Sequence, residues 1–210
     1  MLKSNQFISF EGIDGSGKTT QIGLLKEQLL SLGKKVEVLR EPGGTFISEK
    51  IRKILLDKSS LALSSEAESL LFFASRNQLL KEKIIPMLDK NFFIICDRFN
   101  DSTIAYQGYG FGSDVEKLET ISNFATLDKS PDLTFYLDIS VDKSISRRER
   151  MIDDRIEKKG VRYLEKVRQG FLLIANRNPD RIITIDASLS KKEINDMIWD
   201  IVKEKYEIEV

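Results

Sequence analysis

The segment Gly12-Ile13-Asp14-Gly15-Ser16-Gly17-Lys18-Thr19 decides the fold of this chain. It matches the pattern G-x-x-x-x-G-K-[S/T] and lies between an apolar, strand-like run at 7–10 and a helical pattern. Glycines let successive backbone N–H groups turn inward around a phosphate, and the start of the following helix adds positive potential. Lys18 would reach the β- and γ-phosphates of a nucleotide, and the Thr19 hydroxyl would bind Mg²⁺. The sequence therefore predicts a nucleotide-binding phosphate loop in preference to an ordinary glycine-rich turn.

Short β-rich runs alternate with longer helical patterns along the rest of the chain. The strand candidates lie at 7–10, 36–39, 92–96, 133–137 and 182–185. Strands separated by helices are typical of a parallel sheet covered on both faces. We therefore predict an α/β fold of three layers, with a five-stranded parallel sheet and helices on both faces. It forms one domain over residues 1–210.

Three predicted helices carry recognisable start or stop signals. The first follows Thr19, has Leu25, Leu29 and Leu32 on one face, and should end at Gly33. The last should begin at Ser190, with Glu193 in capping-box spacing, and place Ile194, Met197, Ile198 and Ile201 along one apolar stripe. Between them, residues 66–88 read as a long helix that Pro86 should kink or end.

Composition excludes several classes of protein. The 210 residues contain 33 Lys plus Arg, 33 Asp plus Glu, no histidine and one cysteine, Cys96. Histidine-based acid–base catalysis, zinc sites and disulfides are thereby removed. Zero net charge counts against a nucleic-acid-binding role, and no apolar run approaches the roughly 18 residues that span a bilayer. We expect a cytoplasmic protein with neither a membrane nor a nucleic-acid partner.

Other segments are candidate parts of the site, each with a plainer reading. Asp97 and Arg98 follow the third strand and suit Mg²⁺ and a second phosphate, or form a strand-end salt bridge. Phe72 and Arg76 share one helix face, where ring and guanidinium could bind a base; alternatively Phe72 is core and Arg76 surface. The Arg40-Glu41-Pro42-Gly43-Gly44-Thr45 stretch would form a turn with or without a ligand.

A charged segment at about 147–160 separates the fourth and fifth strands. It contains Arg147, Arg148, Arg150 and Arg155 and almost no apolar residues. Such a segment is either a solvated helix and loop or a lid that brings arginine to a transferring phosphoryl group.

The phosphate loop alone leaves several enzyme and binding classes open. A guanine-reading Asn-Lys-x-Asp motif is absent, and 210 residues leave little room for the machinery of a motor ATPase. A small-molecule kinase is therefore favoured, and a nucleotide-dependent switch or binding module is the rival interpretation.

Taken together, these segments resemble the thymidylate kinase family from about residue 7 to 187. The matches occur in the family's order: the phosphate loop with Asp14, the 40–45 turn, Phe72-Phe73-Ala74-Ser75-Arg76, Asp97-Arg98-Phe99, Ser102-Thr103-Ile104-Ala105-Tyr106-Gln107-Gly108, Pro131-Asp132-Leu133, Asp154-Arg155-Ile156-Glu157 and Ile185-Asp186-Ala187. The resemblance implies a kinase that transfers the ATP γ-phosphoryl group to dTMP, giving dTDP for nucleotide biosynthesis. ATP and Mg²⁺ would be its cofactors, and a homodimer its assembly. A kinase for another nucleoside monophosphate is the alternative among enzymes.

The resemblance also implies a role for each candidate residue. Residues 12–19 would bind ATP, Lys18 and Arg98 would also be catalytic, and Thr19 and Asp97 would serve the metal. Asp14 would hold the sugar 3′-hydroxyl of dTMP, and Arg98 and Arg52 its phosphate. Phe72 would stack on thymine, and Tyr106 would crowd the sugar 2′ position. Arg76, Thr103 and Gln107 would address the base edge. Because residues 13–16 contain no arginine, the catalytic arginine would come from the lid, as Arg150 or Arg155, in the manner of bacterial enzymes.

Overall fold

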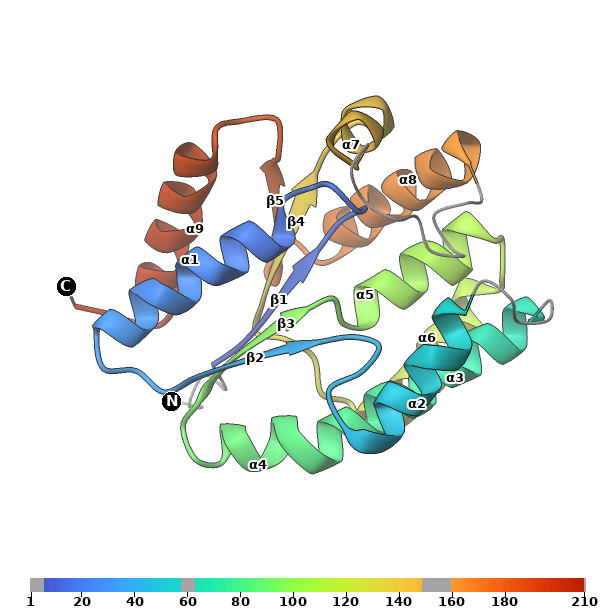
Figure 1. Ribbon diagram of the computed structural model, residues 1–210, viewed down its shortest axis with the longest axis horizontal. Coiled ribbons are helices and arrows are strands. Elements are labelled where there is room, and N and C mark those ends of the chain that lie inside the picture. The colour runs from blue at the N-terminus through green and yellow to red at the C-terminus, as the bar shows by residue number, and fades with distance from the viewer. Residues whose placement is uncertain (1–5, 58–62, 149–159, 210) are drawn as a thin grey trace.

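The computed structural model describes residues 6–57, 63–148 and 160–209, and its centre is one parallel sheet (Figure 1). The strands are β1 (Phe7–Glu11), β2 (Val36–Arg40), β3 (Phe93–Asp97), β4 (Leu133–Asp138) and β5 (Ile182–Asp186), in the spatial order β2-β3-β1-β4-β5. All four strand pairs are parallel. The predicted α/β fold with a five-stranded parallel sheet is confirmed, and each strand lies within one residue of its predicted start.

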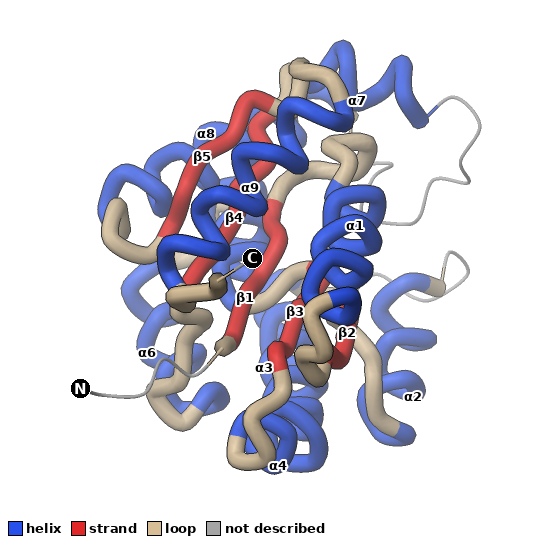
Figure 2. Tube along the Cα trace, turned by 90° about the vertical axis from the view of Figure 1, so that its left-hand side faces the viewer, coloured by secondary structure: helices blue, strands red, loops and turns tan. Residues whose placement is uncertain are grey.

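Helices cover both faces of this sheet (Figure 2). On one face lie α1 (Lys18–Ser31) and α9 (Lys191–Lys205); the opposite face carries α4 (Ile85–Leu88), α5 (Asn100–Thr103) and α8 (Val161–Arg177). The remaining helices are α2 (Phe46–Leu56), α3 (Ser65–Leu79), α6 (Val115–Thr126) and α7 (Val141–Arg148), with π-helical turns η1 (Leu80–Ile84) and η2 (Ile104–Gly110). In the described residues no helix is both long and apolar enough to cross a membrane.

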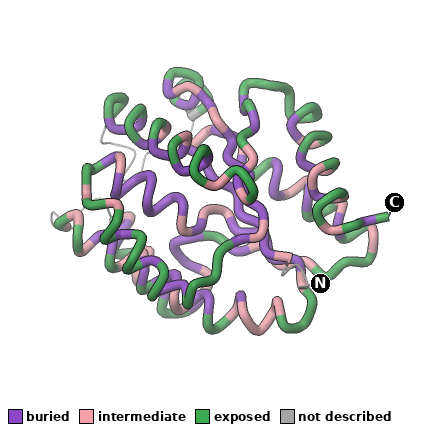
Figure 3. The backbone as a smooth tube through the Cα atoms, turned by 180° about the vertical axis from the view of Figure 1, so that it is seen from behind, coloured by how far each residue is buried: buried purple, intermediate pink, exposed green. Residues whose placement is uncertain are grey.

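Buried side chains of the sheet and of the inner faces of the helices form the core together, and the outer faces of the helices are exposed (Figure 3). Every residue of β1 is buried, as the continuous apolar run of a doubly covered strand requires. Cys96 lies in this core as a buried free thiol. Because parallel strands all end at one edge, Gly12 after β1 and Arg98 after β3 emerge side by side.

The predicted helix boundaries at Gly33 and Ser190 are confirmed, but the last helix buries a different face from the predicted one. Gly33 adopts a φ of +70° just after α1, and Ser190 forms the full capping box with Glu193 at the start of α9. On α9, however, Met197 is 42% exposed. Val202 is buried in its place, one turn beyond Ile198, so the buried stripe is Ile194, Ile198 and Val202.

The predicted helix at 66–88 is continuous helical structure from Ser65 to Leu88, but it is not α-helical throughout. The π-helical turn η1 separates α3 from α4, and Pro86 lies in the first turn of α4. Pro86 has no N–H to donate to the preceding turn, and the α-helical pattern is interrupted by η1 just before α4. The helical structure then ends at Leu88, two residues beyond Pro86, in agreement with the prediction that this proline kinks or ends the helix.

Helix α8 packs closely against η2 through two glycines. A Cβ atom at Gly110 would lie 2.7 Å from the Tyr163 ring, and one at Gly170 would lie 2.7 Å from Tyr109 Cβ. The Tyr163 hydroxyl also donates to the Tyr106 carbonyl at 3.2 Å. The helix that follows the charged segment is thereby joined to the helix carrying Tyr106 and Gln107.

Candidate active site

The phosphate loop connects β1 to α1 in a conformation that requires glycine. Gly12, Gly15 and Gly17 have φ values of +137°, +83° and +95°, in the region that side-chain-bearing residues rarely adopt. A Cβ at Gly12 would also lie 2.7 Å from the Leu137 carbonyl oxygen. The loop therefore curls tightly at the start of α1, where unpaired N–H groups can receive an anion.

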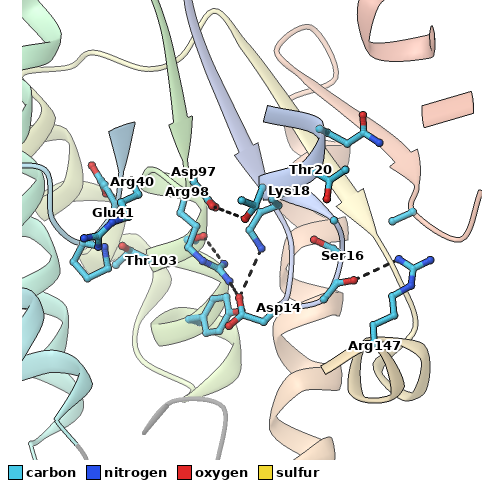
Figure 4. Close-up of a pocket in the computed structure, with 18 of the residues that line it drawn as sticks. Asp14, Ser16, Lys18, Thr20, Arg40, Glu41, Asp97, Arg98, Thr103 and Arg147 are labelled. Carbon is cyan, nitrogen blue, oxygen red and sulfur yellow. Dashed lines mark hydrogen bonds and ion pairs between the residues drawn. The ribbon is translucent and has the colours of Figure 1, made fainter. Parts of the chain in front are cut away.

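Two cations and one carboxylate meet above this loop (Figure 4). Lys18 Nζ donates to the carbonyls of Gly12 at 2.9 Å and Ile13 at 3.2 Å, and it lies 3.7 Å from Asp14 Oδ1. Burial, and then the charge of Arg98, lower the pKa of Lys18. Arg98 donates to Gly12 O at 2.9 Å and pairs with Asp14. The arrangement gathers positive charge where a phosphoryl group would lie between two anions.

Thr19 and Asp97 face each other from α1 and from the end of β3. The Thr19 hydroxyl lies 3.5 Å from Asp97 Oδ2. A hydroxyl and a carboxylate are hard oxygen donors, which suit Mg²⁺. No group of three or more acidic, Cys or His side chains gathers around a common point in the described residues. The pair fits a Mg²⁺ ion that takes few protein ligands and relies on phosphate oxygens and water.

Glu11 supports the Arg98 backbone from below, a role that the sequence did not indicate. It is fully buried at the end of β1, accepts a hydrogen bond from Phe99 N at 2.7 Å and another from the Ser102 hydroxyl. Arg98 has a φ of +71°, so these bonds help to fix an unfavourable backbone. Burial, and then the charge of Asp101, raise the pKa of Glu11 from 4.5 to about 7.

Arg76 is buried, so the alternative that placed it on the surface is wrong. Its side chain is 1% exposed, and its Nε atom donates to Glu41 Oε2 at 2.7 Å. Its Nη2 atom donates to the Phe99 carbonyl and the Thr103 hydroxyl, each at 3.0 Å. The third nitrogen, Nη1, is buried without a partner among the described residues. Burial raises the pKa of Glu41, and the charge of Arg76 opposes that shift.

Phe72 and Gln107 complete this side of the site. Phe72 is only partly buried, so it is not a plain core residue. Gln107 is 1% exposed and its Nε2 atom donates to Glu68 Oε1 at 2.9 Å. Tyr106 places its ring 5.1 Å from the Arg98 guanidinium carbon. Arg52 donates to the Pro42 carbonyl at 2.8 Å.

A single cavity of about 740 Å³ joins the two halves of the site. The predicted residues that line it are Asp14, Gly15, Ser16, Gly17, Lys18, Thr19, Arg52, Phe72, Arg76, Asp97, Arg98, Thr103, Tyr106 and Gln107. Gly12 and Ile13 do not line it, although their carbonyls hold Lys18. The turn after β2 contributes Arg40, Glu41 and Pro42, so it is part of the site.

Helix α7 contacts the phosphate loop from the opposite side (Figure 4). The Ser144 hydroxyl donates to the Asp14 carbonyl at 2.6 Å, and Arg147 Nη1 lies 3.4 Å from the Gly15 carbonyl. Arg147 is exposed and lines the cavity. Arg150 and Arg155 lie outside the described residues, so their predicted roles stay predictions.

Two buried carboxylates in or beside the site, Glu11 and Glu68, were not singled out from the sequence, and Glu41 was named only as part of the 40–45 turn. Glu11, Glu41 and Glu68 are all fully or nearly fully buried. For Glu68 a signal existed, because it precedes Phe72 and Arg76 by one and two helical turns on α3 and therefore shares their face. For Glu11 and Glu41 no spacing pointed to their partners, which lie on other elements.

Comparison with known proteins gives one consistent family. The family model for thymidylate kinase matches residues 10–198. A thymidylate kinase from Thermosipho africanus is 47% identical over 197 residues, covering 94% of this chain and 97% of its relative. One from Thermoanaerobacter sp. (strain X514) is 43% identical over 198 residues, with the same coverage. The crystal structure of thymidylate kinase from Ehrlichia chaffeensis superposes with a TM-score of 0.76 at 37% identity, covering 94% of this chain and 97% of that one.

Proposed function

The chain belongs to the thymidylate kinase family, whose reaction moves a phosphoryl group to dTMP and gives dTDP, and from this premise we propose how its own residues perform that transfer. The donor is ATP, which binds with its phosphates on the loop at 12–19. Lys18 binds the β- and γ-phosphates, and Thr19 with Asp97 holds Mg²⁺, which supplies charge neutralisation when bound. Beyond Thr20 the cavity continues to Ala187 and Ile194, a mainly apolar end that suits a nucleobase.

The acceptor dTMP occupies the side of the cavity lined by α3 and η2. Phe72 stacks on the thymine ring, and Arg76 donates to a carbonyl oxygen of the base. The observation that carries this proposal is the buried Arg76 Nη1 atom, which has no partner in the described residues although the rest of its guanidinium is fully used. An unpaired buried donor is costly, and a bound base carbonyl satisfies it. Thr103 holds Arg76 in place and so contributes to the base edge indirectly.

The sugar and phosphate of dTMP lie nearer the phosphate loop. Asp14 accepts a hydrogen bond from the 3′-hydroxyl, and Tyr106 leaves no room for a 2′-hydroxyl. Arg98 and Arg52 bind the acceptor phosphate. Both arginines line the same cavity as Phe72. A bidentate guanidinium matches a phosphate in shape as well as charge.

The reaction needs positioning and charge neutralisation more than proton transfer. A phosphate monoester has a second pKa near 6 and is already an anionic nucleophile at neutral pH. A general base is therefore unnecessary, in keeping with a chain that lacks histidine. Two polyanions must instead be held close together, and Lys18, Arg98 and an arginine of the 147–160 lid supply the opposing charge. Closure of that lid would keep water from the γ-phosphate.

The experiment that tests this assignment measures ADP release with Mg-ATP and a panel of acceptors. The panel contains dTMP, dUMP, UMP, CMP, AMP, GMP and thymidine. Strong dependence on dTMP with weak use of UMP is the expected result. Turnover driven by another acceptor would overturn the base and sugar assignments, and acceptor-independent hydrolysis would favour a nucleotide switch. An Arg76→Ala variant that keeps the wild-type KM for dTMP would refute the role of Arg76.

A homodimer is the assembly we propose, formed through the outer face of α2, α3 and α6. These three helices lie side by side (Figure 1), and large apolar side chains on them are exposed. Phe46 is 76% exposed on α2, Leu70 is 54% exposed on α3 and Phe124 is 83% exposed on α6. Exposed apolar side chains on three adjacent helices suit self-association about a two-fold axis. Because α3 also carries Phe72 and Arg76, such a dimer would support the acceptor pocket from behind.

A further inference from the structure

Glu68 and Gln107 form a buried pair behind the acceptor side of the cavity. Glu68 lies on α3 with no exposed surface, and Gln107 lies on η2 with 1% exposure. The Gln107 Nε2 atom donates to Glu68 Oε1 at 2.9 Å. Gln107 lines the cavity and Glu68 does not. Glu68 can therefore act on a ligand in the cavity through Gln107.

The pair fixes which end of the Gln107 amide faces the cavity. The Glu68 oxygen accepts the bond and the NH₂ group of Gln107 donates it, so the NH₂ end of the amide is turned toward Glu68. The carbonyl oxygen, Oε1, is then directed away from Glu68. In the described part of the chain this oxygen has no hydrogen-bond partner, and it is not sealed from solvent. Since Gln107 lines the cavity, its open atom is a hydrogen-bond acceptor.

Two neighbours set the donor and acceptor pattern of the same wall. Glu68, Phe72 and Arg76 are spaced four residues apart and lie along one face of α3. Arg76 contributes the unpaired Nη1 donor, and Gln107 contributes the acceptor. The wall therefore offers a donor beside an acceptor. Thymine and uracil carry the complementary edge, a carbonyl at C4 and an N–H at N3. Cytosine carries the reverse, an amino group at C4 and an acceptor at N3.

We propose that Glu68 is a positioning residue for base selection: it locks the Gln107 amide so that the pocket accepts thymine and rejects cytosine. This rests on the proposed placement of the base against Phe72 and Arg76. If the amide could flip, its NH₂ group would donate a hydrogen bond to cytosine N3. That bond would be as good as the one its carbonyl oxygen accepts from thymine N3–H. The carboxylate thus prevents an ambiguity that glutamine alone would allow.

The test compares kcat/KM for dTMP, dUMP and dCMP in Glu68→Gln and in a matched control, Glu66→Gln. Residue 66 is exposed on the same helix and lies outside the site. In E68Q the partner can donate or accept, so the dTMP/dCMP ratio should fall at least ~10-fold, the size of one correctly made hydrogen bond. The dTMP/dUMP ratio should stay unchanged, because both bases carry the same N3–H edge. E66Q should keep both ratios.

A double exchange, Glu68→Gln with Gln107→Glu, provides a rescue. In this variant the amide introduced at position 68 donates to the carboxylate introduced at position 107, whose other oxygen faces the cavity as an acceptor. Discrimination against dCMP should return to within a few-fold of the wild type. A purely structural role for Glu68 predicts no such recovery. A double variant that does not recover its discrimination against dCMP would therefore overturn the proposal.

The wild-type protein gives a measurement that needs no variant. The side-chain ¹⁵N and ¹H signals of Gln107 should keep their hydrogen-bonded shifts when dTMP binds, because the NH₂ group stays on Glu68. A hydrogen bond from this NH₂ group to the base would overturn the inference. A wild-type enzyme that does not phosphorylate dTMP would instead overturn the proposed function. Unchanged discrimination in E68Q, in an enzyme that prefers dTMP, would overturn this inference alone.

Discussion

Replacing Glu11 by glutamine should make the protein more stable at pH 8 and leave it nearly unchanged at pH 4. Glu11 is fully buried beneath the Arg98 loop, with hydrogen bonds from Phe99 N and the Ser102 hydroxyl. Glutamine has the same shape; its carbonyl can accept from Phe99 N, and its NH₂ group can donate to the Ser102 oxygen. The substitution therefore removes the charge and keeps the contacts.

The magnitude follows from the pKa of Glu11. Burial raises that pKa from 4.5 to about 7, so between these values the folded state holds a proton that the unfolded state has lost. Stability from this group is fully present below pH 4.5 and is lost as the pH rises through 7. Integrating the difference in bound protons gives a loss of ~2.5 kcal/mol for the wild type between pH 5 and pH 8. In E11Q this loss is absent.

The assay is urea unfolding followed by circular dichroism at pH 5, 6, 7 and 8. The stability difference between E11Q and the wild type should grow by ~2.5 kcal/mol across this range, with the m-values unchanged. Glu165→Gln, at an exposed position on α8, is the matched control. If the profiles of E11Q and the wild type run parallel, Glu11 is ionised in the folded protein throughout and the reasoning is refuted.

Four further outcomes are expected. Arg155→Ala should lower kcat ~10³-fold or more in steady-state assays, as for arginines that act on the transferring group; a loss confined to ATP affinity would make the lid a binding element only. Gly12→Ala should destabilise by ~1–3 kcal/mol in thermal unfolding because of its positive φ, and a wild-type melting temperature would contradict this. Phe124→Glu should convert the proposed dimer to a monomer in size-exclusion chromatography with light scattering; a variant that stays dimeric would exclude this face. Arg168→Ala should cost ~1–3 kcal/mol in urea unfolding, because it removes the two bonds that Arg168 donates to the partly buried Asp138 carboxylate and leaves that of the Tyr136 hydroxyl; a cost near zero would show that water replaces them.

The sheet was predictable because its strands are continuous apolar runs bounded by helical patterns. The runs predicted at 7–10 and 182–185 are strands in the structure, each one residue longer at its C-terminal end. The order of the strands in the sheet could not be predicted from the sequence. Helix ends were equally clear where a local signal exists, as at Ser190 and Gly33. The π-helical turn before Pro86 was not predictable, since it depends on how the neighbouring elements pack.

The site was predictable where chemistry follows directly from one motif. The phosphate loop and Asp97 could be assigned to the site because each follows a predicted strand. The surroundings of Arg76 did not follow from spacing, because its partners Glu41 and Phe99 come from two other elements and meet only in the folded chain. The family resemblance assigned Arg76 to the base, and the structure adds that the arginine is buried, with its Nε and Nη2 atoms bonded within the protein.

The contacts of α7 and α8 have a consequence for thermodynamic coupling between the two substrates. Helix α7 is bonded to the phosphate loop through Ser144, and α8 is packed against η2 through Gly110 and Gly170. The two helices that flank residues 149–159 therefore contact the loop proposed to bind ATP and the helical turn that carries proposed dTMP-binding residues. An effect of ATP on the affinity for dTMP must be matched by an equal effect of dTMP on the affinity for ATP. Weakening either helix contact, by Ser144→Ala or by enlarging Gly170, should reduce both effects together.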